Sequence, residues 1–340
     1  MFLGAKFRPS FAIQKRTLDH LIALRPSTNK NIPRRLGFAS LVTMAATASK
    51  IQLSASQTPQ FHVEHLSAAS AAKASELLQL NHEKHHIFFN HDGFHNHIAH
   101  HLLTLFALGA TPAQLQKAYD DNARYQRGPE RLQPSVVSDM HDPLRFKTYL
   151  GKEQYYSAFL VFFQGEIDNK GWEDTVQEYV FAGTEQADDM LVRVFAGFLH
   201  PLIHLGFGVE FGQPGIVAEA LAQAAVHEAW MKGLFLGCEE RVEEKDKEKD
   251  KGKGEKKTII QVLDECRKDE TLRHAARQDD ANKIRDGILK RAPREMVDMA
   301  TQYVVREEDD LEEKTAEMVN AAGTSMSLFF SLLLFFSSSN

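Results

Sequence analysis

Histidine is concentrated in one short stretch of this chain. Residues 81–103, NHEKHHIFFNHDGFHNHIAHHLL, hold eight of its 16 histidines. Near neutral pH an imidazole can donate or accept a proton, and its neutral form binds zinc, copper, iron and nickel. The stretch therefore predicts either a metal site or an acid–base centre, and residue spacing alone does not separate the two.

Two pairs of histidines are the strongest candidates for metal ligands. His97 and His101 stand four residues apart, and His200 and His204 repeat that spacing within FLHPLIHLGFGVEF. Residues four apart lie on one face of a helix, so both members of a pair can reach the same ion. Both segments are apolar, and an imidazole without a partner there costs on the order of 1–3 kcal/mol. We therefore expect the two pairs to meet in one shared polar site.

A wider set of residues is expected around these pairs. His95 and His100 are candidates for proton transfer, and Glu210, which ends the segment GFGVE, is the candidate carboxylate for orienting a ligand histidine. His227 has only its neighbour Glu228 in its favour. Eight further histidines are expected to be solvated, to form an outer layer or to be ordinary hydrogen-bonded residues: His62, His65, His82, His85, His86, His91, His141 and His274.

The motifs that are missing narrow the chemistry. Cys238 and Cys266 cannot form a CxxC zinc knuckle, and no HExxH motif accompanies the histidines. A histidine-dominated centre without thiolates fits a catalytic ion such as iron(II), which activates dioxygen, while proton transfer without a metal is the alternative. No GxGxxG after a strand, no P-loop and no GxSxG elbow is present. A nicotinamide or flavin would therefore not bind on a Rossmann unit of this chain.

The elements that position these residues are predicted to be helices. Residues 65–86 lack proline and glycine, and the segment from Asn90 to Gly93 separates them from a second helix that begins near Phe94 and stops at Gly109. Thr111 and Pro112 start a third helix. No alternating strand pattern is found. We expect an all-α protein, a single multi-helical domain whose interior pocket is lined by histidines and by Phe94, Phe195, Phe198 and Phe207.

Composition bounds the partners. The chain is 43% hydrophobic and 25% charged with a net charge of -6, which is typical of a globular protein and gives no reason to expect nucleic acid or an anionic membrane. Two cysteines are consistent with a reducing compartment. We expect a cytoplasmic protein without a membrane span, or a mitochondrial one if the basic N-terminus is translated, because that segment holds a single acid, Asp19.

Three segments depart from the helical pattern. Residues 1–59 are expected to be disordered or targeting-like, with Met44 as an alternative start, and the helical domain is expected over 60–322. The charged run at 239–257 predicts a solvated loop. Residues 323–340 form a hydrophobic tail whose 11-residue apolar run, 326–336, is shorter than the roughly 20 residues of a membrane-spanning helix. We interpret it as an aberrant terminus of a truncated domain.

Taken together, the motifs FHNHIAHHLL, LGATP and HPLIHLGFGVEF resemble the fungal questin oxidase-like family over about residues 61–322. The resemblance implies an all-helical oxidoreductase of secondary metabolism. Such enzymes use dioxygen to open a ring of an anthraquinone-like aromatic polyketide, in a Baeyer–Villiger-type reaction, with NADPH as a candidate reductant. It also implies non-haem iron, with ligands from His97 or its neighbours His95, His100 and His101, and from His200 or His204.

The resemblance leaves competing hypotheses open. Family members carry a DFFxMH-like motif beyond the position where this chain ends, so a truncated, inactive paralogue or a non-catalytic binding protein is the first alternative to the enzyme. A hydrolytic zinc enzyme is the second, and zinc at one equivalent would support it. The substrate itself, the oligomeric state and the need for NADPH are not predicted.

Overall fold

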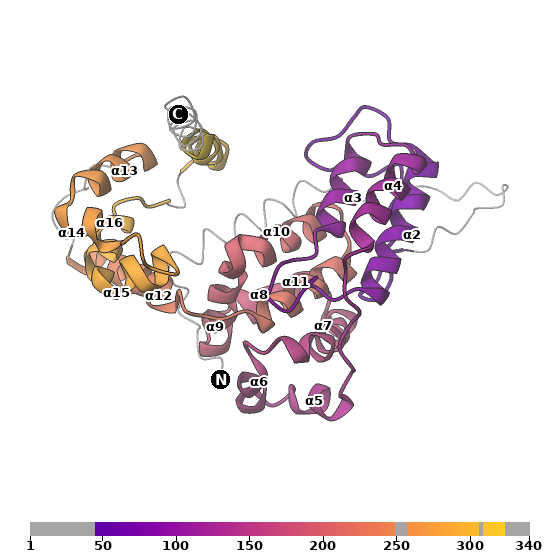
Figure 1. Ribbon diagram of the computed structural model, residues 1–340, viewed down its shortest axis with the longest axis horizontal. Helices are drawn as coiled ribbons and strands as arrows, with labels where there is room; N and C mark the ends of the chain where they lie inside the picture. Colours follow the sequence, from indigo (N-terminus) through magenta and orange to yellow (C-terminus); the bar gives the residue numbers. More distant parts are fainter. Residues whose placement is uncertain (1–44, 249–256, 306–308, 324–340) are drawn as a thin grey trace, which may run out of the picture. The chain divides into compact units, whose positions relative to one another are not determined.

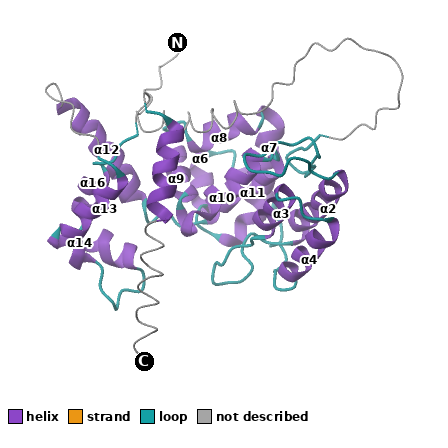
Figure 2. Cartoon of the chain, turned by 90° about the horizontal axis from the view of Figure 1, so that it is seen from above, coloured by secondary structure: helices purple, strands orange, loops and turns teal. Residues whose placement is uncertain are grey.

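The computed structural model describes residues 45–248, 257–305 and 309–323. Within these ranges the regular secondary structure is helical, and strand pairing is limited to an isolated antiparallel bridge between Phe88 and His95 (Figure 2). The all-α prediction is confirmed. The described helices form two compact units that divide between Ala229 and Trp230, and every predicted site residue belongs to the first.

The first unit is built from helices of 6 to 17 residues (Figure 1). Its elements follow one another as α2 (Ala68–Lys84), α3 (Ile98–Ala107), α4 (Pro112–Ala123), α5 (Pro134–Asp139), α6 (Pro143–Tyr149), the 3₁₀ turn η1 (Glu153–Tyr155), α7 (Tyr156–Lys170), α8 (Trp172–Val180), α9 (Glu185–Val194), α10 (Ala196–Glu210) and α11 (Pro214–Val226).

Helix α11 is the central element of this unit. Its residues from Gly215 to Val226 are all buried, and it packs against α7, α9 and α10. A helix that is apolar on every face can only be stable when it is surrounded by other helices. The sequence PGIVAEALAQAAV meets that condition except at Glu219 and Gln223, which are nevertheless buried.

Helices α2, α3 and α4 pack on one another beside α10 (Figure 1). The predicted start of α4 is confirmed: the Thr111 hydroxyl accepts a hydrogen bond from the Gln114 backbone N–H, the Gln114 side chain accepts one from the Thr111 N–H, and Pro112 occupies the first turn. This capping box satisfies backbone donors that would otherwise be left unpaired at a helix start.

The packed part of the first unit includes residues that were assigned to the N-terminal segment. Ile51 and Leu53 are buried in the core of α2, α3 and α4. Their backbone N–H groups donate to the Gln79 and Ser75 side chains of α2 at 2.8 Å. The expected boundary at residue 59 is therefore corrected for residues 45–59, because two apolar side chains and two side-chain acceptors hold this extended stretch in place. Residues 1–44 lie outside the described ranges.

The second unit has its own small core of Val262, Leu272, Ala275, Ala292 and Met299. Its elements are α12 (Lys232–Glu248), α13 (Ile259–Lys268), α14 (Glu270–Ala275), the π turn η2 (Lys283–Ile288), α15 (Leu289–Arg291) and α16 (Pro293–Ala300), and residues 311–323 are also helical.

The charged run at 239–257 is not simply a loop. Residues 239–248 belong to α12, which corrects the loop prediction for them. Pairs of opposite charge three residues apart, such as Arg241 and Glu244 at 3.2 Å, favour a solvated helix in this sequence. Residues 249–256 lie outside the described ranges, as does the predicted tail from 324 onward.

None of the helices in the described ranges is, by itself, both long and apolar enough to cross a bilayer. Helices α9 and α10 reach the required length and composition only together, and they are bent by 95° where they meet.

Candidate functional site

The first group of histidines lies on the segment that leads into α3. This helix begins at Ile98 rather than near Phe94, with His97 as its N-cap residue. The delay has a local cause: the Asn96 backbone N–H donates to the Ile87 carbonyl, and its side-chain carbonyl accepts from the Ile98 N–H. His95 therefore projects from extended backbone and His97 from the N-cap position, and only His100 and His101 belong to the helix.

The second group lies on α10, after an unusual turn. Gly197, Phe198 and Leu199 all have positive φ angles, of 53, 53 and 67°. Right-handed helix follows from His200, and Pro201 sits in its first turn, where no N–H is needed. The proline therefore marks the start of the regular helical part of α10. Two consecutive non-glycine residues in the left-handed region cost on the order of 1–2 kcal/mol each.

The two groups meet as pairs of ring nitrogens. Nε2 of His97 lies 2.8 Å from Nε2 of His200, and Nε2 of His100 lies 3.0 Å from Nδ1 of His204. A third pair joins Nε2 of His95 to Nε2 of His227 at 2.9 Å. We call these six residues the histidine cluster. The expectation that two histidine groups share one polar site agrees with this arrangement, although the partners differ from those expected.

The rings of the cluster are also stacked. His95 lies flat on His200 with ring centroids 3.8 Å apart and planes 9° from parallel. Phe207 of α10 covers His100 in the same way, at 5.3 Å and 11°. These contacts fix the ring planes, so the nitrogen atoms are held in direction as well as in position.

Hydrogen bonds on the outer side of two rings fix their tautomers. Nδ1 of His200 lies 2.6 Å from the Gly197 carbonyl oxygen, which can only accept. Nε2 of His204 lies 2.7 Å from a carboxylate oxygen of Glu219. Each of these nitrogens therefore carries the proton, and in the neutral ring the opposite nitrogen presents its lone pair to the partner histidine.

Burial lowers the pKa of four rings of the cluster. It lowers the pKa of His95 and of His100 to about 2, with neighbouring histidines adding to the effect, and it lowers the pKa of His227 to about 4. The pKa of His97 is lowered for the same reasons. Taking a charged imidazole out of water is unfavourable, and several such rings together repel each other's protons. These four rings are therefore neutral nitrogen donors at physiological pH.

One functional residue was missed. Glu219 on α11 is 2% exposed, and its two oxygens accept from Nε2 of His204 and from Nδ1 of His82, the latter at 2.6 Å. Burial alone would raise the pKa of Glu219, but the two histidine donors lower it to about 2. The same bond raises the pKa of His82 against the effect of burial. His82, expected to be solvated or in an outer layer, is thus tied to the cluster through this carboxylate.

Two expected site residues are not brought to the cluster. His101 is exposed and its Nδ1 contacts the Asn122 side-chain amide at 3.2 Å, because α3 turns it away from His97. Glu210 is exposed and accepts from the Gln60 backbone N–H. The carboxylate that contacts His204 is Glu219 rather than Glu210. Instead, His100 pairs with His204 and His227 pairs with His95, and the spacing in the sequence predicted neither pair.

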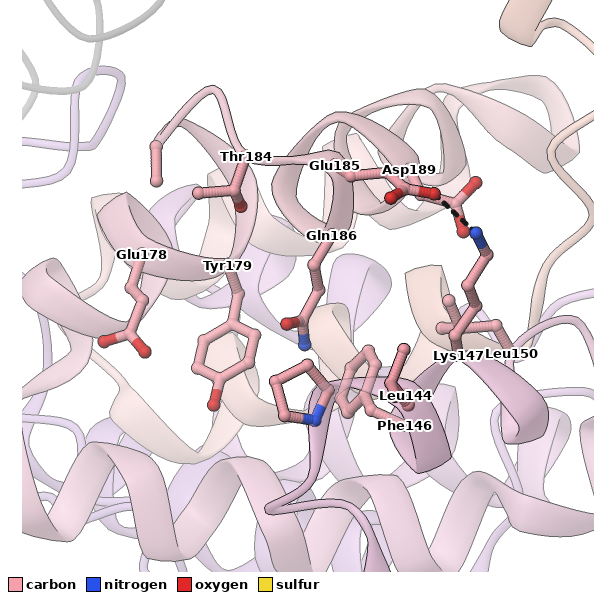
Figure 3. Close-up of a pocket in the computed structure, with 12 residues that line it drawn as sticks. Leu144, Phe146, Lys147, Leu150, Glu178, Tyr179, Thr184, Glu185, Gln186 and Asp189 are labelled. Carbon is pink, nitrogen blue, oxygen red and sulfur yellow. Dashed lines mark hydrogen bonds and ion pairs between the residues drawn. The ribbon is translucent and has the colours of Figure 1, made fainter. Parts of the chain in front are cut away.

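The expected aromatic lining is also divided. Phe207 covers the cluster, whereas Phe94 is 59% exposed and Phe198 is 89% exposed. A cavity of about 420 Å³ lies elsewhere in the first unit, between α6, α8 and α9. Figure 3 shows Phe146 and Tyr179 at this cavity, with Lys147 reaching Glu185 at 2.5 Å. None of the residues that line it is a histidine of the cluster.

The sequence profile of the questin oxidase-like family matches residues 94–329, which include the whole histidine cluster. The chain is a member of the questin oxidase-like family.

Several curated relatives in this family are similar over most of the chain. A protein named Baeyer–Villiger oxidase ptaJ from Pestalotiopsis fici is 39% identical over 81% of this chain and 61% of its own length. Questin oxidase from Aspergillus terreus is 38% identical over 82% of this chain and 61% of its own length. Baeyer–Villiger monooxygenase dmxR6 from a Cryptosporiopsis species is 40% identical over 80% of this chain and 61% of its own length. The chain therefore spans about three fifths of the length of these relatives.

The donor chemistry of the cluster fits an iron ion of the kind that the questin oxidase-like family implies. Across the described ranges, no three His, Cys, Asp or Glu side chains already surround one common point. The facing nitrogens of His97 and His200 and of His100 and His204 are nevertheless 2.8 and 3.0 Å apart. Two ligands at right angles, each about 2.1 Å from a metal, would be about 3.0 Å apart. Neutral rings with tautomers fixed by outer hydrogen bonds are what imidazole ligands require.

Proposed function

We propose that this chain is an O₂-dependent oxidoreductase that oxygenates an anthraquinone-like aromatic polyketide and opens one of its rings. The proposal combines family membership with one structural observation. Four imidazoles, His97, His100, His200 and His204, face one another from two segments about a hundred residues apart, and the outer hydrogen bonds of His200 and His204 leave their inner nitrogens as acceptors. Relatives named Baeyer–Villiger oxidases and questin oxidase support the reaction class.

In this proposal the four imidazoles hold a non-haem iron ion. When bound, iron(II) would supply the site at which dioxygen binds and is activated. The protein's own contribution is to fix the position and the tautomer of these donors. The Gly197 carbonyl holds the proton of His200 on Nδ1, Glu219 holds that of His204 on Nε2, and Phe207 shields one side of His100 from water.

The third pair is proposed to handle protons beside the metal ligands. Nε2 of His95 and Nε2 of His227 are 2.9 Å apart, so one of them donates a proton to the other. Because the pKa of both rings is well below neutrality, the pair carries a single proton between these two atoms and no net charge. A carbonyl or phenol oxygen of a substrate placed next to the pair could exchange a hydrogen bond with it.

The oxygen balance separates two forms of the reaction. If one oxygen atom enters the substrate, the other leaves as water, and that step consumes two electrons and two protons for which NADPH is the candidate source. If both atoms enter the substrate, no external reductant is needed.

The purified chain tests the proposal directly. It would be loaded with iron(II) without oxygen and given an anthraquinone-type polyketide under ¹⁸O₂, with and without NADPH, and products would be analysed by mass spectrometry. We expect a ring-opened product labelled with one or two ¹⁸O atoms. The double variant His97→Ala/His200→Ala should lose both iron and product, whereas His141→Ala, whose side chain is 62% exposed, should lose neither.

Other results would point to the alternatives. A folded chain that binds no iron and forms no product would favour a non-catalytic binding protein. Zinc at one equivalent together with hydrolysis of the substrate would favour a zinc enzyme. Loss of iron from His101→Ala equal to that from His97→Ala would contradict the ligand set that the structure supports.

A further inference from the structure

A single carboxylate joins three other helices to α11 in the interior of the first unit. Glu219 accepts from His204 of α10 at 2.7 Å and from His82 of α2 at 2.6 Å. On the far side of His82, Nε2 accepts from the side-chain amide of Gln164 on α7 at 2.9 Å. The side chains of His82, His204 and Glu219 are 6%, 1% and 3% exposed. These contacts form a hydrogen-bond network with a buried centre, which runs from Gln164 to His204 and on to His100.

The direction of every proton in this chain can be assigned. If the Gln164 amide donates to Nε2 of His82, then Nδ1 of His82 carries the proton that Glu219 accepts. The second oxygen of Glu219 accepts the Nε2 proton of His204, which leaves Nδ1 of His204 as the acceptor that faces His100. Each group therefore makes the bond that its neighbour requires, and the orientation of His204 is determined from α7 and α2 as well as from its own helix.

We propose that Glu219 is a positioning residue that fixes His204 as the Nε2–H tautomer and supplies the negative charge for a cation bound by the histidine cluster. The proposal rests on the proposed function only for the identity of that cation. It assigns a role to a residue on a helix that holds no member of the cluster.

Packing alone does not account for a carboxylate at this position. The rest of α11 is apolar apart from Gln223, which lies one turn further on and is also fully buried. Neither amide atom of Gln223 has a hydrogen-bond partner among the described residues. The helix thus carries two buried polar side chains, one connected and one unconnected. Replacing buried ionic groups with apolar ones is often neutral or stabilising, so the connected carboxylate calls for a reason beyond stability.

Charge supplies that reason. A divalent cation held by these imidazoles would place two positive charges next to the buried ring of His204, which is unfavourable without a nearby anion. The carboxylate of Glu219 stands one imidazole away from the facing nitrogens of His204 and His100. A carboxylate hydrogen-bonded to the outer nitrogen of a ligand histidine also makes the ring a better donor.

Two variants of α11 that make the same replacement test the role of Glu219. Glu219→Met removes both acceptors, and Gln223→Met removes an unpaired amide of similar size from the same helix. Iron(II) affinity would be measured anaerobically by competition with a chelator. We expect a 10- to 100-fold loss, about the effect of removing such a partner, for Glu219→Met, and no change for Gln223→Met. Glu219→Gln, which keeps the shape and one acceptor, should give an intermediate loss and guards against a variant that does not fold.

A measurement without metal separates this proposal from the proposed function. In the iron-free chain, the ¹⁵N shifts of selectively labelled histidine report which nitrogen of His204 carries the proton. We expect Nε2–H in the unmodified chain and a mixture of tautomers in Glu219→Met. If His204 keeps the same tautomer in that variant, the positioning role is wrong. If the unmodified chain binds no iron but His204 responds as expected, the proposed function fails and the positioning role stands.

Discussion

A methyl group at Gly197 is the sharpest test of how the histidine cluster is built. The backbone there is left-handed, with φ 53° and ψ 45°. A Cβ atom would stand 2.6 Å from Nε2 of His227 and 2.8 Å from Nε2 of His95, the two atoms that hydrogen-bond to each other. Carbon and nitrogen atoms that are not bonded prefer about 3.5–4.0 Å. In Gly197→Ala these two rings would have to separate, or the turn that begins α10 would have to change.

The expected cost has two parts. An alanine in the left-handed region costs roughly 1–2 kcal/mol relative to glycine. Forcing a methyl group into a packed site costs about 1–3 kcal/mol more, because the rings that must move are packed, with His95 stacked on His200 and His227 in tilted contact with Phe88. We therefore expect Gly197→Ala to lower the free energy of unfolding by about 2–5 kcal/mol, a large fraction of the roughly 5–15 kcal/mol of a typical domain.

Two other glycines of α10 provide matched controls. A Cβ at Gly206 meets no atom within 4 Å, so Gly206→Ala should stabilise the helix by about 0.5–1 kcal/mol through propensity alone. A Cβ at Gly208 would stand 2.8 Å from the backbone nitrogen of Val217 on α11. Gly208→Ala should therefore destabilise the protein by a clash that touches no histidine.

Urea unfolding and anaerobic iron(II) binding of the three variants would decide the matter. Gly197→Ala should lose both stability and iron affinity, whereas folded Gly208→Ala should bind iron as the unmodified chain does. The reasoning is refuted if Gly197→Ala unfolds within about 0.5 kcal/mol of the unmodified chain, the usual range for surface changes. It is equally refuted if its loss of iron is no greater than that of Gly208→Ala.

Three further predictions follow from packing, backbone strain and charge. Ile51→Ala should lower the free energy of unfolding by about 2–5 kcal/mol in urea, because residue 51 is 1% exposed; a change below 1 kcal/mol would contradict its place in the core. Phe198→Gly should raise it by about 0.5–1 kcal/mol, because glycine relieves a positive φ and the lost side chain is mostly exposed; a lower value would contradict this. Burial lowers the pKa of His86 to about 4 and of His100 to about 2, while that of His82 is raised. Below about pH 6.5 the two histidines therefore bind protons in the unfolded chain but stay neutral in the folded chain. The free energy of unfolding of the metal-free protein should fall by at most about 1.4 kcal/mol per pH unit for each of them, and the raised pKa of His82 should offset part of this loss. Equal stability in urea titrations at pH 7 and at pH 5 would refute this prediction.

The helices and their local signals were predictable because they depend on neighbouring residues. The start of α4 follows from Thr111, Pro112 and Gln114, which lie within four positions of one another. The role of Pro201 follows from its missing N–H in the same way. Each of these signals satisfies or removes a backbone hydrogen bond nearby, so it holds wherever the helix ends up in the fold.

The histidine pairing was only partly predictable, because it depends on where a helix begins. The spacing of His97 and His101 implies a shared face only if both residues are helical. The bond from the Asn96 N–H to the Ile87 carbonyl holds the chain extended through residue 96. Helix α3 therefore begins at Ile98, and His97 lies one residue before it. The true partners, His97 with His200 and His100 with His204, are 103 and 104 residues apart and are set by the packing of α3 on α10. No local pattern carries that information.

Glu219 shows what a sequence signal for such a site would look like. PGIVAEALAQAAV is a 13-residue segment with one charged residue, and a helix so apolar must be buried on all faces. A carboxylate carried into the interior by such a helix costs several kcal/mol unless donors meet it there. The segment therefore predicts that Glu219 has buried, protonated partners, and in a chain with 16 histidines the candidate donors are imidazoles. That inference needs no knowledge of the pairing, and it leads to the interior of the site more directly than the spacing of the histidines does.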